Sequence, residues 1–383
     1  MSSRALLERL YRAALGGADP EAAVRRALVR PDVARALATA RSVGVFAVGK
    51  AAGSMARAAQ SVEALRTLVV LPAGHSRRGL EGRDVVFASH PEPDRSSVRA
   101  ARRAIAFFRS FGPRDVVLCL VSGGTSSLLA LPRPGLSLAE KRRAVRKLSQ
   151  SGASILALNR LRTSLSAVKG GRLGEATRAR LVTLVLSDVP GDRPAVVGSG
   201  PTVRGRRGDL VRVVGSNGSG LDAAAKKARA LGYRVQREHR RLSGEAQIAG
   251  RRLARLAREL PAGTVLLSGG ETVVTLSPRH GRGGRSLELA LAAAPALVGT
   301  DLALLAAGSD GLDGSSGAAG AFADGRTLAR GKRLGLDPRE ALGRHDSRAF
   351  FAAAGGLFVT GPTEGNVGDW VFVVRNRRPH RPV

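Results

Sequence analysis

The chain has 383 residues, of which 43% are hydrophobic and 24% are charged, and its formal net charge is +32. This length predicts two domains with sizeable cores, and no apolar run is long enough for a membrane span, which argues against a membrane protein. The single cysteine, Cys119, excludes an intramolecular disulfide and lies in an apolar run that predicts a buried structural thiol.

The positive charge comes mostly from arginines that are spread along the whole chain. Aromatic residues make up only 3% of the chain, and no basic tail, zinc-finger spacing or aromatic stacking platform occurs. We therefore expect no specific nucleic-acid partner, although weak, salt-dependent binding to polyanions is still expected from the charge.

The N-terminus, MSSRALLERLYRAAL, predicts an amphipathic helix and lacks the apolar centre and cleavage site of a signal peptide. We therefore expect a cytoplasmic protein.

Strand and helix patterns alternate along the chain, which predicts an α/β fold with mostly parallel sheets. Helices are expected over 4–16, 20–29, 97–111, 137–150, 151–158, from about 218 to 231, 244–259 and 285–297. Strands are expected over 43–48, 67–71, 85–88, 116–121, 181–186, 211–214, 264–267, 302–306, 357–359 and 370–374.

Most of the predicted strands end in glycines together with serine, threonine, aspartate or lysine, as in Gly49-Lys50, Ser122-Gly123-Gly124 and Ser268-Gly269-Gly270. The carboxyl ends of parallel strands share one edge of a sheet, so these loops can converge on one crevice. Glycine allows close backbone approach, and successive free amides form an anion-binding nest. No Walker loop of the form GxxxxGK[ST] occurs. Together the loops predict an anionic, phosphorylated ligand.

The segment from Leu181 to Thr202, LVTLVLSDVPGDRPAVVGSGPT, is a buried strand followed by two acids, Asp188 and Asp192, and a loop that contains Gly200. Two carboxylates beside a glycine-rich loop suit a magnesium–phosphate site. The alternative is a solvated loop with two ordinary surface acids.

Three basic residues, Lys50, Lys169 and Arg285, follow strands or stand in glycine-rich loops, where they can bind phosphate or carboxylate groups. The alternative for each is a solvated cation in an arginine-rich chain. Acids also follow strands in the C-terminal half, and His75 and His90 follow strands where they could line a site.

Long motifs in a fixed order cover nearly the whole chain: VGKAAGSMA, HPEPD, VSGGTSSLL, SGASILALNRLRTSLSAVKGGRL, LVLSDVPGDRPAVVGSGPT, LLSGGETVV, GRGGRSLELAL, GSDGLDGSSGAAGA and TGPTEGNVGD. In these motifs the chain resembles the glycerate 2-kinase family, which has an N-terminal DUF4147-type region and a C-terminal MOFRL domain.

The resemblance implies two α/β domains, a Rossmann-like one with a mostly parallel sheet over 1–232 and a smaller MOFRL-type one over 233–383, with the active site in the cleft between them. It implies transfer of the γ-phosphoryl group of ATP to the 2-hydroxyl of D-glycerate, with Mg²⁺, to give 2-phosphoglycerate and ADP. The expected partners are D-glycerate and ATP, and a homodimer is left open. Relatives were often labelled hydroxypyruvate reductase.

The resemblance also assigns residues. It implies catalytic roles for Lys50, Asp188, Asp192 and Arg285, with the two aspartates as candidate Mg²⁺ ligands or proton acceptors. The implied substrate- and nucleotide-binding residues are Ser122, Gly123, Gly124, Ser126, Asn159, Arg162, Lys169, Gly200, Thr202, Gly270, Glu271, Asp310, Asp313, Thr363 and Asn366. Asp369 matches a further polar position.

The chain departs from the family pattern at a few positions. Ser286 and Leu287 replace an Asn-Gln pair after Arg285, Gly317 stands where an acid is usual, and Glu364 adds a carboxylate. These changes affect the expected substrate preference and leave the lysine, the arginine and the two aspartates in place.

Two other functions compete with the kinase. A hydroxypyruvate reductase would need a dinucleotide fingerprint, and no G-x-G-x-x-G follows a strand with an acid about 20 residues later. A non-catalytic polyanion-binding protein is the second alternative, and the net charge of +32 is its only support.

Overall fold

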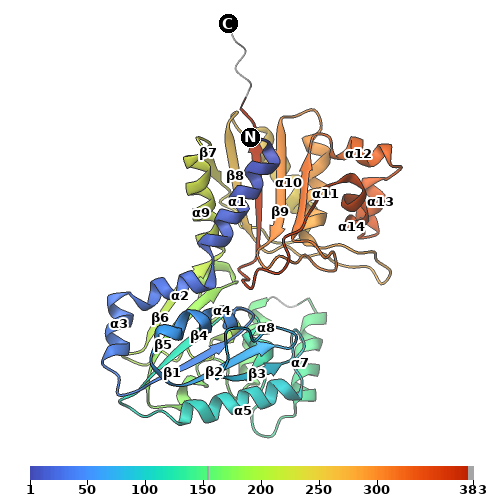
Figure 1. Cartoon of the computed structure of the whole chain (residues 1–383). Coiled ribbons are helices and arrows are strands. Elements are labelled where there is room, and N and C mark those ends of the chain that lie inside the picture. The colour runs from blue at the N-terminus through green and yellow to red at the C-terminus, as the bar shows by residue number, and fades with distance from the viewer. Residues whose placement is uncertain (153–154, 378–383) are drawn as a thin grey trace. The chain divides into compact units, whose positions relative to one another are not determined.

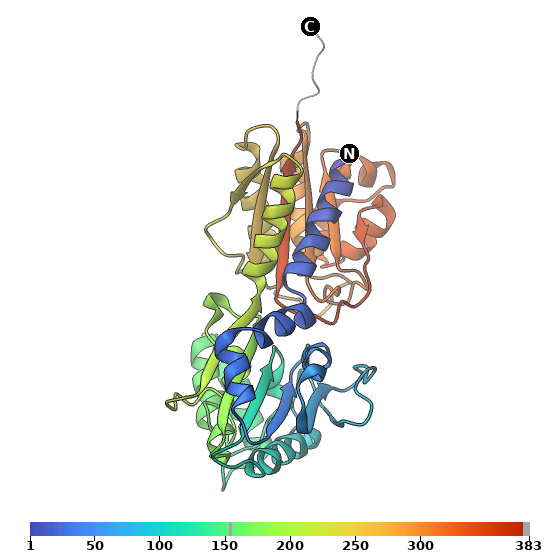
Figure 2. The ribbon, with the colours of Figure 1, turned by 60° about the vertical axis from the view of Figure 1, so that its left-hand side comes forward.

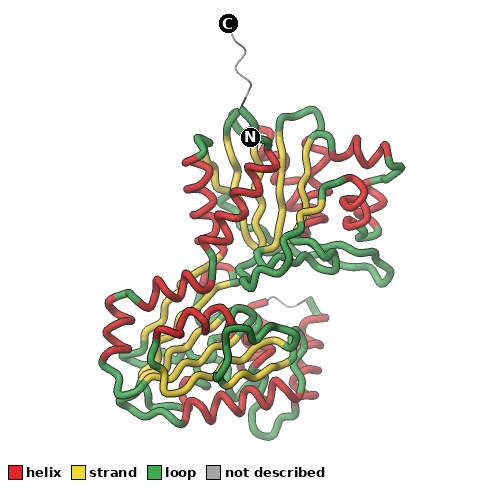
Figure 3. The backbone as a smooth tube through the Cα atoms, in the orientation of Figure 1, coloured by secondary structure: helices red, strands yellow, loops and turns green. Residues whose placement is uncertain are grey.

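The computed structural model describes residues 1–152 and 155–377, which form two compact units (Figure 1). The parallel-sheet unit contains Asp19–Ser216 and Glu364–Asn366. The mixed-sheet unit contains Met1–Ala18, Asn217–Thr363 and the chain from Val367 onward. Figure 3 shows that each unit is a sheet with helices packed against it.

Six parallel strands form the first sheet, in the order β3-β2-β1-β4-β5-β6. They are β1 (Val43–Val48), β2 (Ala64–Pro72), β3 (Asp84–Ala88), β4 (Val116–Val121), β5 (Arg180–Ser187) and β6 (Leu210–Ser216). The strand order reverses between β1 and β4, and ligands of open α/β sheets bind outside the carboxyl ends of the strands at such a switch point.

Helices cover both faces of this sheet, so β1 and β4 are buried along their whole length and appear in the sequence as continuous apolar runs. Phe46 of β1 packs on Phe107 and Phe108 of one covering helix. The buried thiol of Cys119 lies in the same core, as predicted.

The helices of the parallel-sheet unit are α2 (Pro20–Leu28), α3 (Pro31–Ala38), α4 (Ala52–Ala58), α5 (Arg95–Arg109), α6 (Thr125–Leu128), α7 (Leu138–Gln150) and α8 (Ile155–Ser164). Short 3₁₀ turns lie at Ala59–Ser61, Gly174–Ala176, Pro190–Asp192 and Val197–Ser199.

The second sheet is mixed, with the order β11-β10-β9-β12-β8-β7. Its strands are β7 (Arg234–Arg237), β8 (Thr264–Gly270), β9 (Leu302–Gly308), β10 (Gly320–Asp324), β11 (Leu357–Phe358) and β12 (Asp369–Arg375). The β7–β8 pair is parallel, and the pairs β8–β12, β12–β9, β9–β10 and β10–β11 are antiparallel. The expectation of mostly parallel pairing is therefore wrong for this sheet, because β12 is inserted between β8 and β9 in the opposite direction.

The insertion of β12 still brings three strand ends to one edge. Because β8 and β9 are both antiparallel to β12, they run in the same direction, and Asp369 at the start of β12 pairs with Gly270 and Gly308 at their ends. The loops that follow β8 and β9 therefore meet at the edge where β12 begins.

The N-terminal helix α1 (Ser3–Gly17) packs beside α9 (Asn217–Ala230) against the mixed sheet (Figures 1 and 2). The buried Tyr11 of α1 donates a hydrogen bond of 2.7 Å to the carbonyl of Gly308. The units therefore differ from the predicted ranges 1–232 and 233–383, because both α1 and α9 pack on the second sheet. The remaining helices of this unit are α10 (Ala246–Arg258), α11 (Arg285–Leu297), α12 (Thr327–Arg333), α13 (Pro338–Gly343) and α14 (Ser347–Ala354).

Most predicted elements occur within a few residues of their expected bounds. The predicted helix over 151–158 is α8, which ends at Ser164, and residues 153 and 154 lie outside the described residues. No helix in the described ranges is both long and apolar enough to cross a membrane.

Candidate active site

The loops after β1 and β4 are joined to each other at the switch point of the parallel sheet. The Lys50 amide donates to the Gly123 carbonyl at 2.8 Å. Gly49 has a φ of 122°, and a side chain there would collide with Ser122, so glycine is required where the two loops meet. The fold thus places the predicted lysine next to the predicted Ser-Gly-Gly loop.

Asp188, which follows β5, lies against the same loop. A methyl group added at Gly123 would overlap the Asp188 carboxylate, and one added at Gly124 would lie 3.2 Å from both Lys50 Cγ and His90 Cδ2. The two glycines therefore allow a lysine, a carboxylate and an imidazole to gather at the switch point.

The histidines beside Lys50 have lowered pKa values. For both His75 and His90, burial is the largest cause, and the charge of Lys50 lowers the pKa further. Both imidazoles are therefore neutral near neutral pH, when they can accept a proton or a hydrogen bond. The sequence indicated only that each follows a strand, and neither was assigned to the site by the resemblance.

A second pair of loops is joined farther along the same unit. The Gly170 amide donates to the Ser199 carbonyl, and the Gly171 amide donates to the Gly200 carbonyl, both at 2.8 Å. This ladder brings the predicted residue Gly200, whose φ is 53°, next to the predicted Lys169 loop.

Two predicted binding residues are buried and bonded within the protein. Ser122 is 0% exposed, and its Oγ accepts from the Ala51 amide and donates to the Val48 carbonyl. Thr202 is 1% exposed and accepts a 3.2 Å hydrogen bond from Thr183. Their hydroxyl groups hold the loops in place.

Lys169 belongs to a group of three cations. It is 3% exposed, and its Nζ donates to Ser126 Oγ. Lys141 of α7 is 4% exposed, and its Nζ has no hydrogen-bond partner among the described residues. Burial, followed by the charges of Lys141 and Arg162, holds the pKa of Lys169 well below its ordinary value. Sequence reasoning missed Lys141, because a lysine in an amphipathic helix normally faces solvent.

Asn159 lies near these cations in sequence and lines a cavity of about 530 Å³. Arg160, Arg193 and Ser199 are also among the residues that line this cavity. The predicted asparagine therefore lies in basic surroundings.

Replacing Lys141 with methionine is expected to stabilise the protein at neutral pH. Burial lowers the pKa of Lys141 from 10.5 to about 8, so between these values the folded protein binds fewer protons than the unfolded chain. Below about pH 8 the buried ammonium is charged and lowers the stability of the folded protein by its full amount. This destabilisation disappears as the pH rises toward 10.5. Lys141→Met should therefore raise the free energy of unfolding by about 1–3 kcal/mol near neutral pH. Denaturant titrations across this pH range should show the gain disappearing at the alkaline end, and a pH-independent difference would contradict the explanation.

Asp192 carries a buried carboxylate oxygen that is free for a ligand. Its Oδ1 has no hydrogen-bond partner among the described residues. Its φ of 48° lies in the left-handed region, which is uncommon for a residue with a side chain. A buried carboxylate oxygen without a partner fits a cation such as Mg²⁺, which is commonly bound by one or two carboxylates together with phosphate oxygens and waters.

In the mixed-sheet unit, Arg285 contacts two other candidate site residues, Asp369 and Glu271. Its Nε lies 2.6 Å from Asp369 Oδ2 and its Nη2 lies 3.0 Å from Asp369 Oδ1, while Nη1 pairs with Glu271. Asp369 is buried, whereas the Glu271 side chain is 52% exposed. An anionic substrate group could therefore take the place of Glu271 while Asp369 continues to orient the guanidinium.

The other predicted residues of this unit surround the same loops. The buried Asp313 accepts from the amides of Ser286 and Leu287 at the start of α11, and burial raises its pKa to about 6. The Thr363 amide donates to the Asp310 carbonyl at 3.1 Å. Asp313 is thus bonded to the backbone and holds α11 in place.

The departures from the family pattern have simple structural outcomes. Leu287 is buried in the hydrophobic core of the mixed-sheet unit. Glu364 accepts a 3.0 Å hydrogen bond from Ser54 and pairs with Arg57, and its added carboxylate is therefore already bonded. Asn366 belongs to the parallel-sheet unit with Glu364.

The site residues of the two units differ in charge. In the parallel-sheet unit, the positive charges of Lys141 and Arg162 act on Lys169, whereas several carboxylates surround Arg285 in the mixed-sheet unit. Electrostatics therefore favours the surroundings of Lys169 over those of Arg285 for groups that carry several negative charges.

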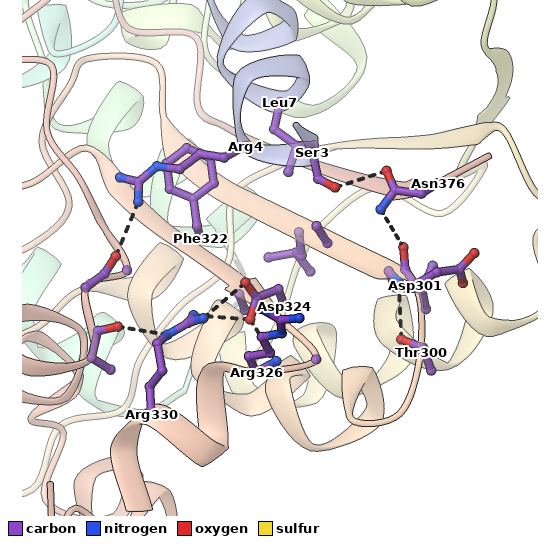
Figure 4. Close-up of a pocket in the computed structure, with 18 of the residues that line it drawn as sticks. Ser3, Arg4, Leu7, Thr300, Asp301, Phe322, Asp324, Arg326, Arg330 and Asn376 are labelled. Atoms are coloured by element: carbon purple, nitrogen blue, oxygen red, sulfur yellow. Dashed lines mark hydrogen bonds and ion pairs between the residues drawn. The ribbon is translucent and has the colours of Figure 1, made fainter. Parts of the chain in front are cut away.

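A larger cavity of about 770 Å³ lies at the opposite edge of the mixed sheet, where β9 begins (Figure 4). Its polar side chains bond to one another: Ser3 donates to Asn376 at 3.0 Å, and Arg330 lies 3.1 Å from Asp324. None of the predicted site residues lines this cavity.

Comparisons with known proteins match both units. A family model described as "Domain of unknown function (DUF4147)" matches residues 6–217, and the MOFRL family model matches residues 264–369. The chain is 37% identical to a putative hydroxypyruvate reductase of Agrobacterium vitis, over 96% of this chain and 94% of that protein. It is 35% identical to the D-glycerate 2-kinase of Thermotoga maritima, over 92% of this chain and 94% of that protein. The crystal structure of a glycerate kinase from Thermotoga maritima matches with a TM-score of 0.87 and 33% identity, covering 97% of this chain and 98% of that one.

Proposed function

Because the chain belongs to the glycerate 2-kinase family, we propose that it transfers the γ-phosphoryl group of ATP to the 2-hydroxyl of D-glycerate, giving 2-phosphoglycerate and ADP. The observation that carries the proposal is the group at the switch point, where Lys50 and Asp188 lie against the same pair of glycines. Phosphoryl transfer depends mainly on positioning and charge stabilisation, which such a group can supply.

Lys50 stabilises the negative charge that develops on the transferred phosphoryl group. Arg285 binds the carboxylate of D-glycerate through the part of its guanidinium that pairs with the exposed Glu271. Asp369 keeps the guanidinium oriented through two contacts of 2.6 and 3.0 Å. The expectation that both units contribute to one active site stays a prediction.

Asp192 and Asp188 would hold Mg²⁺. The unpartnered buried Oδ1 of Asp192 supports this aspartate in particular. When bound, the ion would neutralise part of the charge on the phosphate groups of the nucleotide. One of these two aspartates would accept the proton of the 2-hydroxyl. The cytoplasmic location and the homodimer stay predictions.

Gly123→Ala is expected to reduce kinase activity by about 100-fold, because catalytic groups displaced by about 1 Å lose that much. The backbone at Gly123 lies outside the left-handed region, so alanine is allowed there, but its methyl group would displace the Asp188 carboxylate. Steady-state kinetics and thermal unfolding should show lost activity with retained folding. Gly16→Ala is a matched control because a methyl group there meets no atom within 4 Å. Full activity of Gly123→Ala would remove Asp188 from the reaction.

The name of the Agrobacterium vitis relative makes hydroxypyruvate reduction the second candidate. The turn after β1 reads Gly49-Lys50-Ala51-Ala52-Gly53-Ser54. Counted from Gly49, it has Ala51 and Ser54 where a dinucleotide fingerprint has its second and third glycines. Two assays on one preparation separate the activities. We expect ADP release that requires both ATP and D-glycerate, and no oxidation of NADH or NADPH with hydroxypyruvate. The reverse result would replace the kinase with a reductase.

A further inference from the structure

We propose that Lys141, Arg162 and Lys169 form a binding site for a phosphate group in the parallel-sheet unit. We call these residues the three-cation site. Lys141 is the new member, because neither its sequence pattern nor the family motifs assign it a role. The source of the phosphate group, though not the site itself, rests on the proposed kinase function.

The first argument is the burial of two lysines. Lys141 and Lys169 are 4% and 3% exposed, although lysine is rarely buried unless it is paired. The Lys169 ammonium donates to the Ser126 hydroxyl, whereas the Lys141 ammonium has no partner among residues 1–152 and 155–377. A buried ammonium without a partner indicates that an absent ligand completes its hydrogen bonds.

The second argument is the absence of a balancing acid. Among the described residues, no carboxylate acts on the pKa of Lys141, Arg162 or Lys169: burial alone lowers the pKa of Lys141 and of Arg162. The positive charges of Lys141 and Arg162 both act on Lys169. Three like charges in a partly buried group repel one another, and an anion that binds between them removes that cost. The group is therefore arranged for an anionic ligand.

The third argument identifies the ligand as phosphate. Three cations suit a multiply charged group better than a carboxylate with a single charge. Hydroxyl donors also lie beside the lysines, because Ser126 Oγ contacts Lys169 Nζ and lies 3.3 Å from Ser199 Oγ. A phosphate group has enough acceptor oxygens to bind ammonium, guanidinium and hydroxyl donors at the same time.

The test compares Lys141→Met with Lys147→Met, which removes an exposed lysine from the same helix. Inorganic phosphate is titrated into each full-length protein by calorimetry and by thermal unfolding. Lys141→Met should weaken phosphate binding by roughly 10- to 100-fold, which is the effect of losing a hydrogen bond to a charged group, and Lys147→Met should not change it. Equal phosphate affinity in Lys141→Met and the unchanged protein would overturn the proposal.

Titrations with ATP, 2-phosphoglycerate and D-glycerate distinguish the sources of the phosphate. If the nucleotide supplies it, Lys141→Met should weaken ATP binding. If the phosphorylated product supplies it, the loss should appear with 2-phosphoglycerate. A loss confined to D-glycerate would overturn the proposal in favour of a carboxylate site.

Two features keep this test separate from folding and from the kinase function. Lys141→Arg keeps the charge and should retain phosphate affinity within a few-fold. Lys141→Gln is a second neutral variant and should lose phosphate affinity as Lys141→Met does. Because phosphate binding is measured without turnover, a Lys141-dependent affinity in an inactive protein would leave the site standing and reject the kinase. If the protein is an active kinase and Lys141→Met does not change its phosphate affinity, the kinase function would stand and the three-cation site would be rejected.

Discussion

Lys50→Ala is expected to lower the kcat for phosphorylation of D-glycerate by about 100- to 1000-fold, which is the usual effect of removing one charge-stabilising donor. The Lys50 amide is fixed by its 2.8 Å bond to the Gly123 carbonyl, and this bond survives the substitution because it involves only the backbone. The variant should therefore fold normally and lose the ammonium alone. Initial rates at saturating ATP and D-glycerate measure the effect.

Lys147→Ala is the control for Lys50→Ala, because Lys147 is an exposed lysine of the same unit. It removes the same charge from the protein without touching the switch point. A Lys50→Ala enzyme with unchanged kcat would show that the charge at the switch point has no part in the chemical step.

Arg285→Ala is expected to lower kcat/KM for D-glycerate by about 100-fold or more and to destabilise the fold by about 3 kcal/mol. The activity falls because the substrate carboxylate loses its guanidinium partner. The stability falls because the Asp369 carboxylate loses both of its contacts with Arg285, at 2.6 and 3.0 Å, and stays buried.

The direction in which the stability of Arg285→Ala changes with pH tests the role of Asp369. Burial raises the pKa of Asp369 to about 7, and the charge of Arg285 opposes that rise. Removing Arg285 removes the effect that opposes the rise, so the pKa of Asp369 rises further. At higher pH the folded variant keeps a proton that the unfolded chain has released, and its stability should fall with rising pH more than that of the unchanged protein does. Denaturant unfolding at about pH 5 and about pH 8 should show the larger loss at the higher pH.

The double variant Arg285→Ala/Asp369→Asn separates stability from activity. A neutral amide needs no cationic partner, so the double variant should regain most of the lost stability and remain inactive. If the double variant regained both stability and kinase activity, Arg285 would only support the fold. A stability loss that does not change with pH would contradict the assigned role of Asp369.

The parallel sheet was predictable because its signals are local. Both β1 and β4 are buried on two faces, so their bounds follow from apolar runs, and both match the predicted ranges 43–48 and 116–121. The family motifs also placed Lys50 and Ser122 in the loops that follow these strands, and the fold brings those loops together.

The mixed sheet was less predictable because its pairing is not local. β7 and β10 were missed, since β7 is exposed along most of its four residues and β10 is a short Gly-Ala-Phe-Ala-Asp segment. The antiparallel position of β12 depends on contacts with β8 and β9, which lie far from it in sequence. The hydrophobic pattern within a strand does not show in which direction the strand runs relative to distant partners.

For the candidate site, the sequence predicted residue positions but not the environments of the side chains. The motifs named Ser122 and Thr202, but only the structure shows that both hydroxyls are buried and bonded within the protein. Conversely, Lys141 lies in an ordinary helical pattern, and its burial follows from packing that the pattern does not encode. Side-chain exposure and hydrogen-bond satisfaction are tertiary properties.

The most direct test of the proposed function is phosphorus NMR of a reaction that contains the protein, ATP, Mg²⁺ and D-glycerate. The account predicts a new phosphate-ester signal that matches authentic 2-phosphoglycerate, together with the signals of ADP. A matching signal for 3-phosphoglycerate would contradict the assigned hydroxyl. The release of inorganic phosphate alone, or the absence of any reaction, would contradict glycerate 2-kinase activity.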